Sequence, residues 1–214
     1  MPRRDEALRK YHGGPARSFY NAGARTGIEG FRRQYVDRLG LKPGETVLDV
    51  GCGTGLSFAM LEEGVGPQGR VIGIDQSPDQ LALARTLVER SNWHNVTLMN
   101  SPVEDANIPA EADAALISFS HDIMRTPEAL ENMIRSLKRG ARIVAVGMRW
   151  APWWALGVNL RTWRIARQFI TTFEGFSRPW SNLDKLVSSL EVEPMVSSLG
   201  GSGSVGIYIV VACK

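Results

Sequence analysis

The sequence predicts an α/β fold with a doubly wound, seven-stranded, mostly parallel sheet and an antiparallel last strand. From Glu45 onward, short runs of Val, Ile and Leu alternate with longer segments of helical spacing, which is typical of crossovers between parallel strands. The glycine- and serine-rich stretch SLGGSGS, residues 198–204, separates the last two strands. Because it suits a hairpin loop, we expect the final strand to run antiparallel beside its neighbour.

The expected strands are apolar runs bounded by turn residues, at residues 46–50, 70–74, 95–99, 113–118, 141–147, 191–197 and 205–212. A helix is expected from about Thr54, directly after the first strand. Residues 77–80, Ser-Pro-Asp-Gln, mark another helix start with a capping serine and a proline in the first turn. Residues 126–128 repeat this pattern, and we expect Gly140 to end the helix that follows.

The length of 214 residues suits one domain with a substantial core. We expect four parts along it: an N-terminal helical cap over residues 1–44, a core over 45–147, a helical insertion over 148–180, and a last helix with two strands over 181–214.

Composition narrows the function classes only slightly. The net charge of +3, from 25 Lys and Arg against 22 Asp and Glu, does not by itself indicate nucleic acid. Two cysteines, Cys52 and Cys213, form neither a disulfide framework nor a zinc-ligand cluster, so we expect no metal and a cytoplasmic location. Residues 1–10 lack the apolar segment of a secretory signal, and no apolar run is long enough to span a bilayer.

The strongest local signal is VLDVGCGTG, residues 47–55, where an apolar strand ends in an acid and three alternating glycines. Glycines are needed where the backbone turns sharply off a strand and a ligand approaches without a Cβ in the way. In a dinucleotide fingerprint the third glycine would fall on Leu56 or Phe58, depending on the register, so that pattern fails. A phosphate-binding P-loop fails too, because no Gly-Lys-Ser/Thr follows.

The pattern that fits is D-x-G-x-G-x-G, from Asp49 to Gly55. Here the sequence resembles the class I S-adenosylmethionine-dependent methyltransferases, which have a Rossmann-like fold, and the resemblance spans roughly residues 15–214. It implies S-adenosylmethionine as cofactor and S-adenosylhomocysteine as product. The cofactor-binding residues that it implies in this loop are Asp49, Gly51, Cys52, Gly53 and Gly55.

The second strand ends in Asp75, twenty-four residues after Gly51. An acid at this place can accept hydrogen bonds from both ribose hydroxyls of an adenosine bound over the first loop, and the resemblance implies that role for Asp75, with Gln76 beside it. The alternative is that Asp75 only opens the turn before Ser77.

Two further regions are similar to motifs of the family. In NSPVEDANIP, residues 100–109, the resemblance implies that Val103 and Glu104 contact the adenine. Pro102 stands where the family usually has an aspartate, which leaves the adenine contact to the backbone of Val103 or the carboxylate of Glu104.

In ISFSHD, residues 117–122, the resemblance places Ser118 and Phe119 beside the methionine part of the cofactor. His121 and Asp122 then face the acceptor as candidate catalytic residues, with His121 as a base and Asp122 orienting it. The alternative is a loop histidine with a nearby capping aspartate. Methyl transfer depends mainly on alignment and desolvation, so a dedicated base is optional.

The insertion holds five of the six tryptophans, and no Asp or Glu occurs from Asn132 to Phe173. Arginine with aromatic residues suits an acceptor with an anionic head and an apolar body, or contact with a membrane surface. The alternative is a plain core helix with snorkelling arginines. The expected substrate-binding residues are Tyr20, Arg149, Trp154, Arg161 and Arg164.

The sequence therefore predicts a methyltransferase that acts on nitrogen or oxygen of a small, amphipathic or lipid-like acceptor, with a phospholipid headgroup as first choice and another small metabolite or natural product as the alternative. The family's exocyclic-amine and pyrimidine C5 nucleic-acid methylases are excluded, because their N/D-P-P-Y and Pro-Cys motifs are absent after the fourth strand. An RNA methyltransferase and a non-catalytic, cofactor-binding regulator stay open. We expect a cytoplasmic protein, with or without peripheral membrane contact, and no nucleic-acid partner.

Overall fold

The computed structural model describes residues 26–108, 111–198 and 204–214. Its centre is a seven-stranded sheet with the order β3-β2-β1-β4-β5-β7-β6, in which β7 runs antiparallel to both of its neighbours. The predicted doubly wound, mostly parallel sheet with an antiparallel last strand is confirmed. The strands are β1 Thr46–Val50, β2 Arg70–Asp75, β3 Val96–Asn100, β4 Ala112–Ser118, β5 Leu137–Met148, β6 Ser189–Ser198 and β7 Ser204–Cys213.

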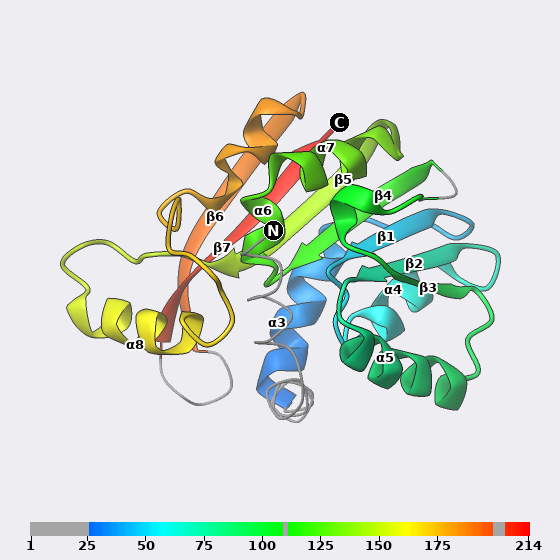
Figure 1. Ribbon diagram of the computed structural model, residues 1–214, viewed down its shortest axis with the longest axis horizontal. Coiled ribbons are helices and arrows are strands. Elements are labelled where there is room, and N and C mark those ends of the chain that lie inside the picture. The colour runs from blue at the N-terminus through cyan, green and yellow to red at the C-terminus, as the bar shows by residue number, and fades with distance from the viewer. Residues whose placement is uncertain (1–25, 109–110, 199–203) are drawn as a thin grey trace.

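Helices cover both faces of the sheet (Figure 1). They are α3 Thr26–Asp37, α4 Phe58–Val65, α5 Pro78–Ser91, α6 His121–Met124, α7 Pro127–Arg135 and α8 Leu156–Ala166. Side chains alternate along each strand, so β1 sends Val47 to the core shared with α3 and α4, and Leu48 and Val50 to the core shared with α7. Burial on both faces explains why these strands are almost continuously apolar.

Local sequence signals set some helix ends correctly. The Ser77 hydroxyl accepts a hydrogen bond from the Gln80 N–H at 3.4 Å, directly before Pro78 begins α5. Asn92, with a φ of 54°, follows the end of that helix.

Three expectations about helices were wrong. The helix after the glycine motif begins at Phe58 rather than near Thr54, and α7 ends at Arg135, so that Gly140 lies inside β5 with a φ of 75°. Leu137 is buried and pairs with β4, which favours a longer strand over another helical turn. The last helix expected after residue 180 is replaced by two 3₁₀ turns, η2 Pro179–Ser181 and η3 Leu183–Lys185.

Within the described ranges, no helix is long and apolar enough to cross a membrane. The expected N-terminal helical cap is represented by α3, and the rest of it lies outside the described residues.

The helical insertion is attached to the sheet through Thr162, a fully buried residue of α8. Its hydroxyl accepts a hydrogen bond from the Gly206 N–H of β7 at 3.1 Å and donates one to the Val158 carbonyl at 2.9 Å. One polar side chain therefore satisfies a buried donor of the sheet and fixes the helix against it.

Replacing Thr162 with valine keeps the volume but leaves the Gly206 N–H without a partner. We expect T162V to lower the free energy of unfolding by about 1–3 kcal/mol, measured by urea denaturation. The matched control is T86V on α5, where an exposed threonine bonds only to the carbonyl four residues before it, and we expect little change there. Equal losses in the two variants would contradict this account.

Candidate active site

The glycine motif forms a tight loop between the ends of three strands. The N–H groups of Gly51 and Cys52 both donate to the Ile74 carbonyl of β2, at 2.8 and 3.0 Å. Gly51 has a φ of 74°, and a Cβ on it would lie 2.4 Å from the Ser120 hydroxyl oxygen that follows β4. The loop therefore needs glycine here both for its conformation and for this close approach.

Cys52 lies in this loop with its side chain buried toward β2. A Cβ on Gly73 of that strand would be 3.0 Å from the Cys52 sulfur. Burial raises the pKa of the Cys52 thiol well above its ordinary value, and the nearby acids Asp49 and Asp75 raise it further. The thiol thus stays protonated and fills space, so any contact of this residue with the cofactor would come from its backbone.

Asp75, at the end of β2, holds the loop in place. Its Oδ2 accepts a hydrogen bond from the Gly53 N–H at 2.9 Å, and its Oδ1 accepts one from the Ser77 N–H at 2.8 Å. Each carboxylate oxygen has a second lone pair for a ligand hydroxyl. The Asp75 carboxylate can therefore stabilise the turn before Ser77 and still accept hydrogen bonds from a ligand at this edge of the sheet. Gln76 lies beside it, half-buried.

Asp49 is the most unusual charged group of the site. Its side chain is 1 % exposed, and its Oδ1 has no hydrogen-bond partner. Burial, and secondly the charge of Asp75, raise the pKa of Asp49 to about 7, although Arg32 of α3 acts in the opposite direction. A buried oxygen without a partner is costly, so this one indicates a place for a donor or cation from a ligand.

The segment after β3 forms the short 3₁₀ turn η1, Val103–Asp105. Val103 is buried, and its carbonyl and that of Ala106 accept hydrogen bonds from the Asn132 amide of α7, at 2.7 and 2.8 Å. Glu104 is half-buried on the same turn. Asn132 thus fixes the turn, and the adenine contact of Val103 or Glu104 stays a prediction.

The chain leaves β4 through a strained residue, Phe119. Its φ is 54°, a conformation that residues other than glycine adopt at some cost, and its N–H donates to the Val146 carbonyl of β5 at 2.7 Å. Ser118 before it is half-buried. The Ser120 hydroxyl is within hydrogen-bond distance of the Ser118 and Gly51 carbonyls, at 3.2 and 3.4 Å. This turn therefore joins the glycine loop to the start of α6.

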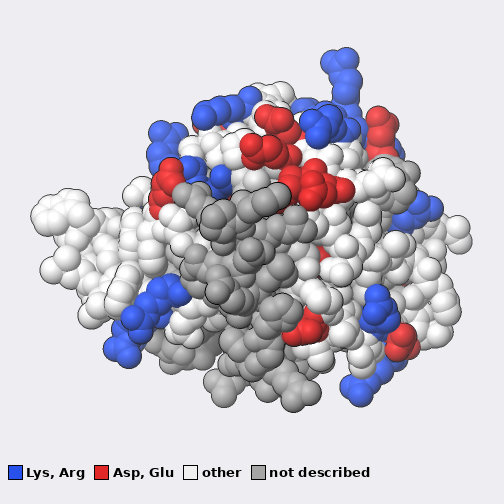
Figure 2. Space-filling view, in the orientation of Figure 1, with Lys and Arg blue, Asp and Glu red and all other residues white. Residues whose placement is uncertain are grey.

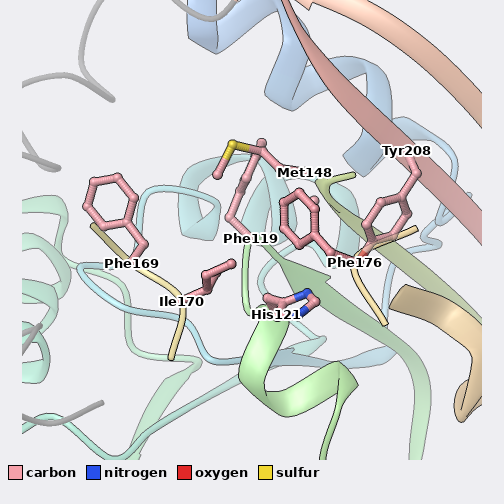
Figure 3. Close-up of a pocket in the computed structure, with 8 residues that line it drawn as sticks. Phe119, His121, Met148, Phe169, Ile170, Phe176 and Tyr208 are labelled. Carbon is pink, nitrogen blue, oxygen red and sulfur yellow. The ribbon is translucent and has the colours of Figure 1, made fainter. Parts of the chain in front are cut away.

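Beside this turn lies a small cavity with an almost entirely apolar lining (Figure 3). Its lining residues are Phe119, His121, Gly147, Met148, Phe169, Ile170, Phe176 and Tyr208. They come from the ends of β4 and β5, from β7, and from the segment after α8.

His121 is the one titratable side chain of this lining besides Tyr208. It is 7 % exposed, its two ring nitrogens make no hydrogen bond, and its ring meets Phe176 edge to face with centroids 5.2 Å apart. Burial lowers the pKa of His121 below its ordinary value, while the charge of Asp122 and the nearby backbone groups of Glu174 and Thr172 act in the opposite direction. The imidazole is therefore neutral at pH 7 and can accept a proton.

Asp122 does not pair with His121, contrary to the expected arrangement. Its Oδ1 accepts hydrogen bonds from the Thr171 N–H at 3.2 Å and the Thr171 hydroxyl at 2.9 Å. Directly after this helix, Arg125 donates to the Ser181 hydroxyl at 2.9 Å and packs against Gly175. Helix α6 and Arg125 thus fasten the segment that covers the cavity, and Asp122 acts on the imidazole through its charge and not through a hydrogen bond.

The expected substrate-binding residues do not line the cavity. The Arg149 guanidinium lies 5.6 Å from the centre of the Trp180 ring, and its Nε donates to the Trp150 carbonyl. Trp154, Arg161 and Arg164 are exposed, outside the cavity. Tyr20 lies outside the described residues.

The interpretation of α8 as a plain core helix was wrong, because its large apolar side chains are exposed. The cavity residues after α8 were missed as a group. The spacing of Phe169, Phe173 and Phe176 was the available signal, and Phe173 and Phe176 pack with Trp150.

A family model described as a methyltransferase domain matches residues 41–168, more than half of the chain. The chain belongs to this family. The predicted class I methyltransferase domain is thereby confirmed, and its glycine loop, Asp75 and the β4 turn lie in the matched region.

Two individual relatives are each similar to part of this chain. A protein of 37.1 kDa in transposon TN4556 of Streptomyces fradiae is 32% identical over 142 residues, 65% of this chain and 39% of that protein. Demethylmenaquinone methyltransferase of Listeria welshimeri is 30% identical over 118 residues, 54% of this chain and 50% of that protein. The match thus spans half or less of the length of these relatives.

Among solved structures, N-methyltransferase NodS from Bradyrhizobium japonicum WM9, in complex with S-adenosylhomocysteine, has the same fold. The TM-score is 0.67 at 14% identity, with 98% of this chain and 97% of that chain covered.

The residues present fit S-adenosylmethionine. The partnerless Asp49 oxygen is suited to the cationic end of the cofactor. The glycine loop beside it is held to β2 by the Asp75 carboxylate, which accepts the Gly53 N–H. The remaining lone pairs of Asp75 suit the ribose hydroxyls. The methyltransferase domain thus carries complementary groups for both ends of this cofactor.

The raised pKa of Asp49 predicts a pH-dependent cofactor affinity. A cation favours the ionised acid, so we expect the affinity for S-adenosylmethionine to rise as pH increases through about 7, with proton release on binding. D49N should bind more weakly and with a flatter pH profile, measured by titration calorimetry. The control is D37N, an exposed acid on α3. An unchanged profile in D49N would exclude Asp49 as the titrating group.

Proposed function

We propose that this methyltransferase transfers the methyl group of S-adenosylmethionine to oxygen or nitrogen of a small, apolar acceptor that enters the cavity beside His121. The observation that carries the proposal is a buried, neutral imidazole in an aromatic cavity next to the glycine loop, with backbone groups of Thr172 and Glu174 near the ring and no side chain bonded to it. A neutral imidazole in this position can act as a general base that removes a proton from the methyl acceptor.

The chain's own contribution to the reaction is alignment, exclusion of water and proton removal. Bound S-adenosylmethionine supplies an electrophilic methyl group. Asp49, Asp75 and the glycine loop hold the cofactor, while Phe119, Phe176 and Ile170 shape the acceptor side of the site. The neutral His121 ring accepts the proton that a hydroxyl or ammonium group of the acceptor gives up.

The covering segment must move for an acceptor to enter. The cavity volume is about 20 Å³, room for about one water molecule. Thr171 and Gly175, held by Asp122 and Arg125, belong to the segment that closes it. Opening therefore breaks the contacts with α6, and closing restores a dry site.

The cavity supports a neutral ring or apolar chain more than a phosphate-bearing headgroup. No Lys or Arg is among the residues that line it within the described chain, so a phosphate there would lack a cation. The name of the demethylmenaquinone methyltransferase relative supports a quinone-like acceptor. Such acceptors reside in membranes, and we therefore include peripheral membrane contact in the proposal. A phospholipid headgroup is the second candidate.

The base role of His121 predicts a defined kinetic defect. We expect H121Q to lower kcat by about 10²–10⁴-fold without changing the affinity for S-adenosylmethionine. The wild-type rate should fall as pH decreases below 6.5, through the lowered pKa of His121, because a protonated ring cannot accept another proton.

The measurement is methyl transfer to a demethylquinol and to phosphatidylethanolamine, each in detergent micelles. H94Q, in an exposed loop, is the matched control. Full turnover in H121Q would exclude the base role, and calorimetry without cofactor binding by the wild type would overturn the whole proposal.

A further inference from the structure

We propose that the start of α8 and the loop before it, residues 152–163, form a docking surface for an anionic phospholipid membrane. We call these residues the α8 tip. The inference rests on the proposed function for its purpose, which is access to a membrane-borne acceptor. The docking itself can be measured without any turnover.

The α8 tip exposes an unusual amount of apolar surface. Its exposed side chains are Trp153 at 84%, Leu156 at 74%, Trp154 at 69%, Leu160 at 60% and Trp163 at 41%. Figure 2 shows a projection without charged side chains at the left edge, where Figure 1 has the loop leading into α8. Clustered surface of this kind marks an interaction site.

In α8 the large apolar side chains face solvent and small side chains face the protein, the opposite of a typical surface helix. At 100° per residue, Leu156, Leu160 and Trp163 fall on one face, and this face is exposed. The buried residues of α8 are the small Thr162 and Ala166, on the side of the helix roughly 100° away from that face. The large apolar side chains thus contribute little to folding.

The exposed loop is also held in shape. The Asn159 side chain accepts a hydrogen bond from the Ala151 N–H at 2.9 Å and donates to the carbonyls of Ala151 and Pro152, at 3.3 and 3.2 Å. The Ala155 N–H closes a turn onto the Pro152 carbonyl at 2.9 Å. Trp153 and Trp154 are therefore presented by an ordered turn, which lowers the entropic cost of docking.

The α8 tip is uncharged at its most exposed end and is followed by arginines, a distribution that suits the surface of an anionic bilayer. Residues 152–160 carry no charge, whereas Arg161, Arg164 and Arg167 follow and are exposed. With a rise of 1.5 Å per residue, Arg161 lies about 8 Å along the helix from Leu156. Tryptophans and leucines at the tip would enter the interface, with arginines behind them at the level of the headgroups.

Two other occupants fit this distribution less well. A second copy of the chain, packed symmetrically on the same patch, would bring arginines toward arginines, since no acid occurs from Asn132 to Phe173. A nucleic acid needs cations at the contact, and the most exposed part, residues 152–156, has none.

The α8 tip also lies close to the site along the chain. Phe169 and Ile170, which follow the end of α8 at Ala166, line the cavity beside His121. A bilayer that holds α8 thus touches the helix that leads into the covering segment, and an apolar acceptor would pass from lipid to cavity along it.

The test is flotation of the whole chain with vesicles of phosphatidylcholine alone or with about one third phosphatidylglycerol. We expect binding to the anionic vesicles, weakened about tenfold or more by W153S/W154S. R161Q/R164Q should weaken it about ten- to thirtyfold at low salt. The charge-matched control R85Q/R90Q, on α5 at the other end of the molecule (Figure 1), should bind like wild type.

Four outcomes would overturn the docking proposal: no binding to anionic vesicles, equal binding by W153S/W154S, a wild-type dimer in ultracentrifugation that W153S/W154S abolishes, or RNA binding that vesicles do not displace. Unfolding curves of the variants establish that they fold. If vesicle binding fails while methyl transfer to a micellar quinol persists, docking alone is wrong. If S-adenosylmethionine does not bind while vesicle binding persists, the proposed function alone is wrong.

Discussion

The pairing of β1 with β2 on one side and with β4 on the other is the constraint on which the functional edge depends. Val50, at the carboxyl end of β1, lies in register with Ile74 and Ile117. The chain leaves β1 toward β2 and β3 and later returns to β4 on the opposite side. The two connections diverge above β1, and ligands of open α/β sheets bind in the crevice between them.

This edge is stabilised by the rest of the sheet, because its own electrostatics are unfavourable. Asp49 is buried close to the half-buried Asp75, and the charge of Asp75 is one reason for the raised pKa of Asp49. A folded-state pKa above the unfolded one means that this acid weakens the ligand-free fold as pH rises through about 7. The two apolar cores on either face supply the stability that permits the arrangement. A cationic ligand removes part of the repulsion, so the site is prepared for such a ligand before it arrives.

The structural elements that could be predicted from the sequence were those that depend on a few neighbouring residues. The strand that ends in Asp49, the glycines that follow and the Ser77 cap each depend on a few neighbouring residues, and the sequence was sufficient to place them. The end of α7 was not predictable in this way, because Leu137 joins β5 through pairing with a distant strand. Two short 3₁₀ turns replaced the expected last helix where Trp180 and Leu183 are buried in the core.

The acceptor side of the site depends on contacts between distant residues. Asp122 accepts hydrogen bonds from Thr171, 49 residues later, and none from His121. No local pattern distinguishes those two partners. The strain at Phe119 likewise follows from its hydrogen bond to Val146 of β5. The sequence was therefore sufficient to place the loop between β1 and β2 residue by residue, and the side of the site beyond β4 only as a region.

The exposed apolar side chains of the α8 tip add little to the stability of the fold and favour aggregation, so folding alone does not explain them. Replacing Leu156, Leu160 or Trp163 with polar residues would leave the contacts of Thr162 with β7 intact and would reduce the tendency to aggregate. Apolar side chains on an ordered projection are therefore best accounted for by a contact that they make in use. The same helix leads directly into the residues that close the cavity, so a contact there acts on the segment that has to open. We therefore propose that access of the acceptor and closure of the site both depend on one continuous stretch, from the α8 tip to Phe176.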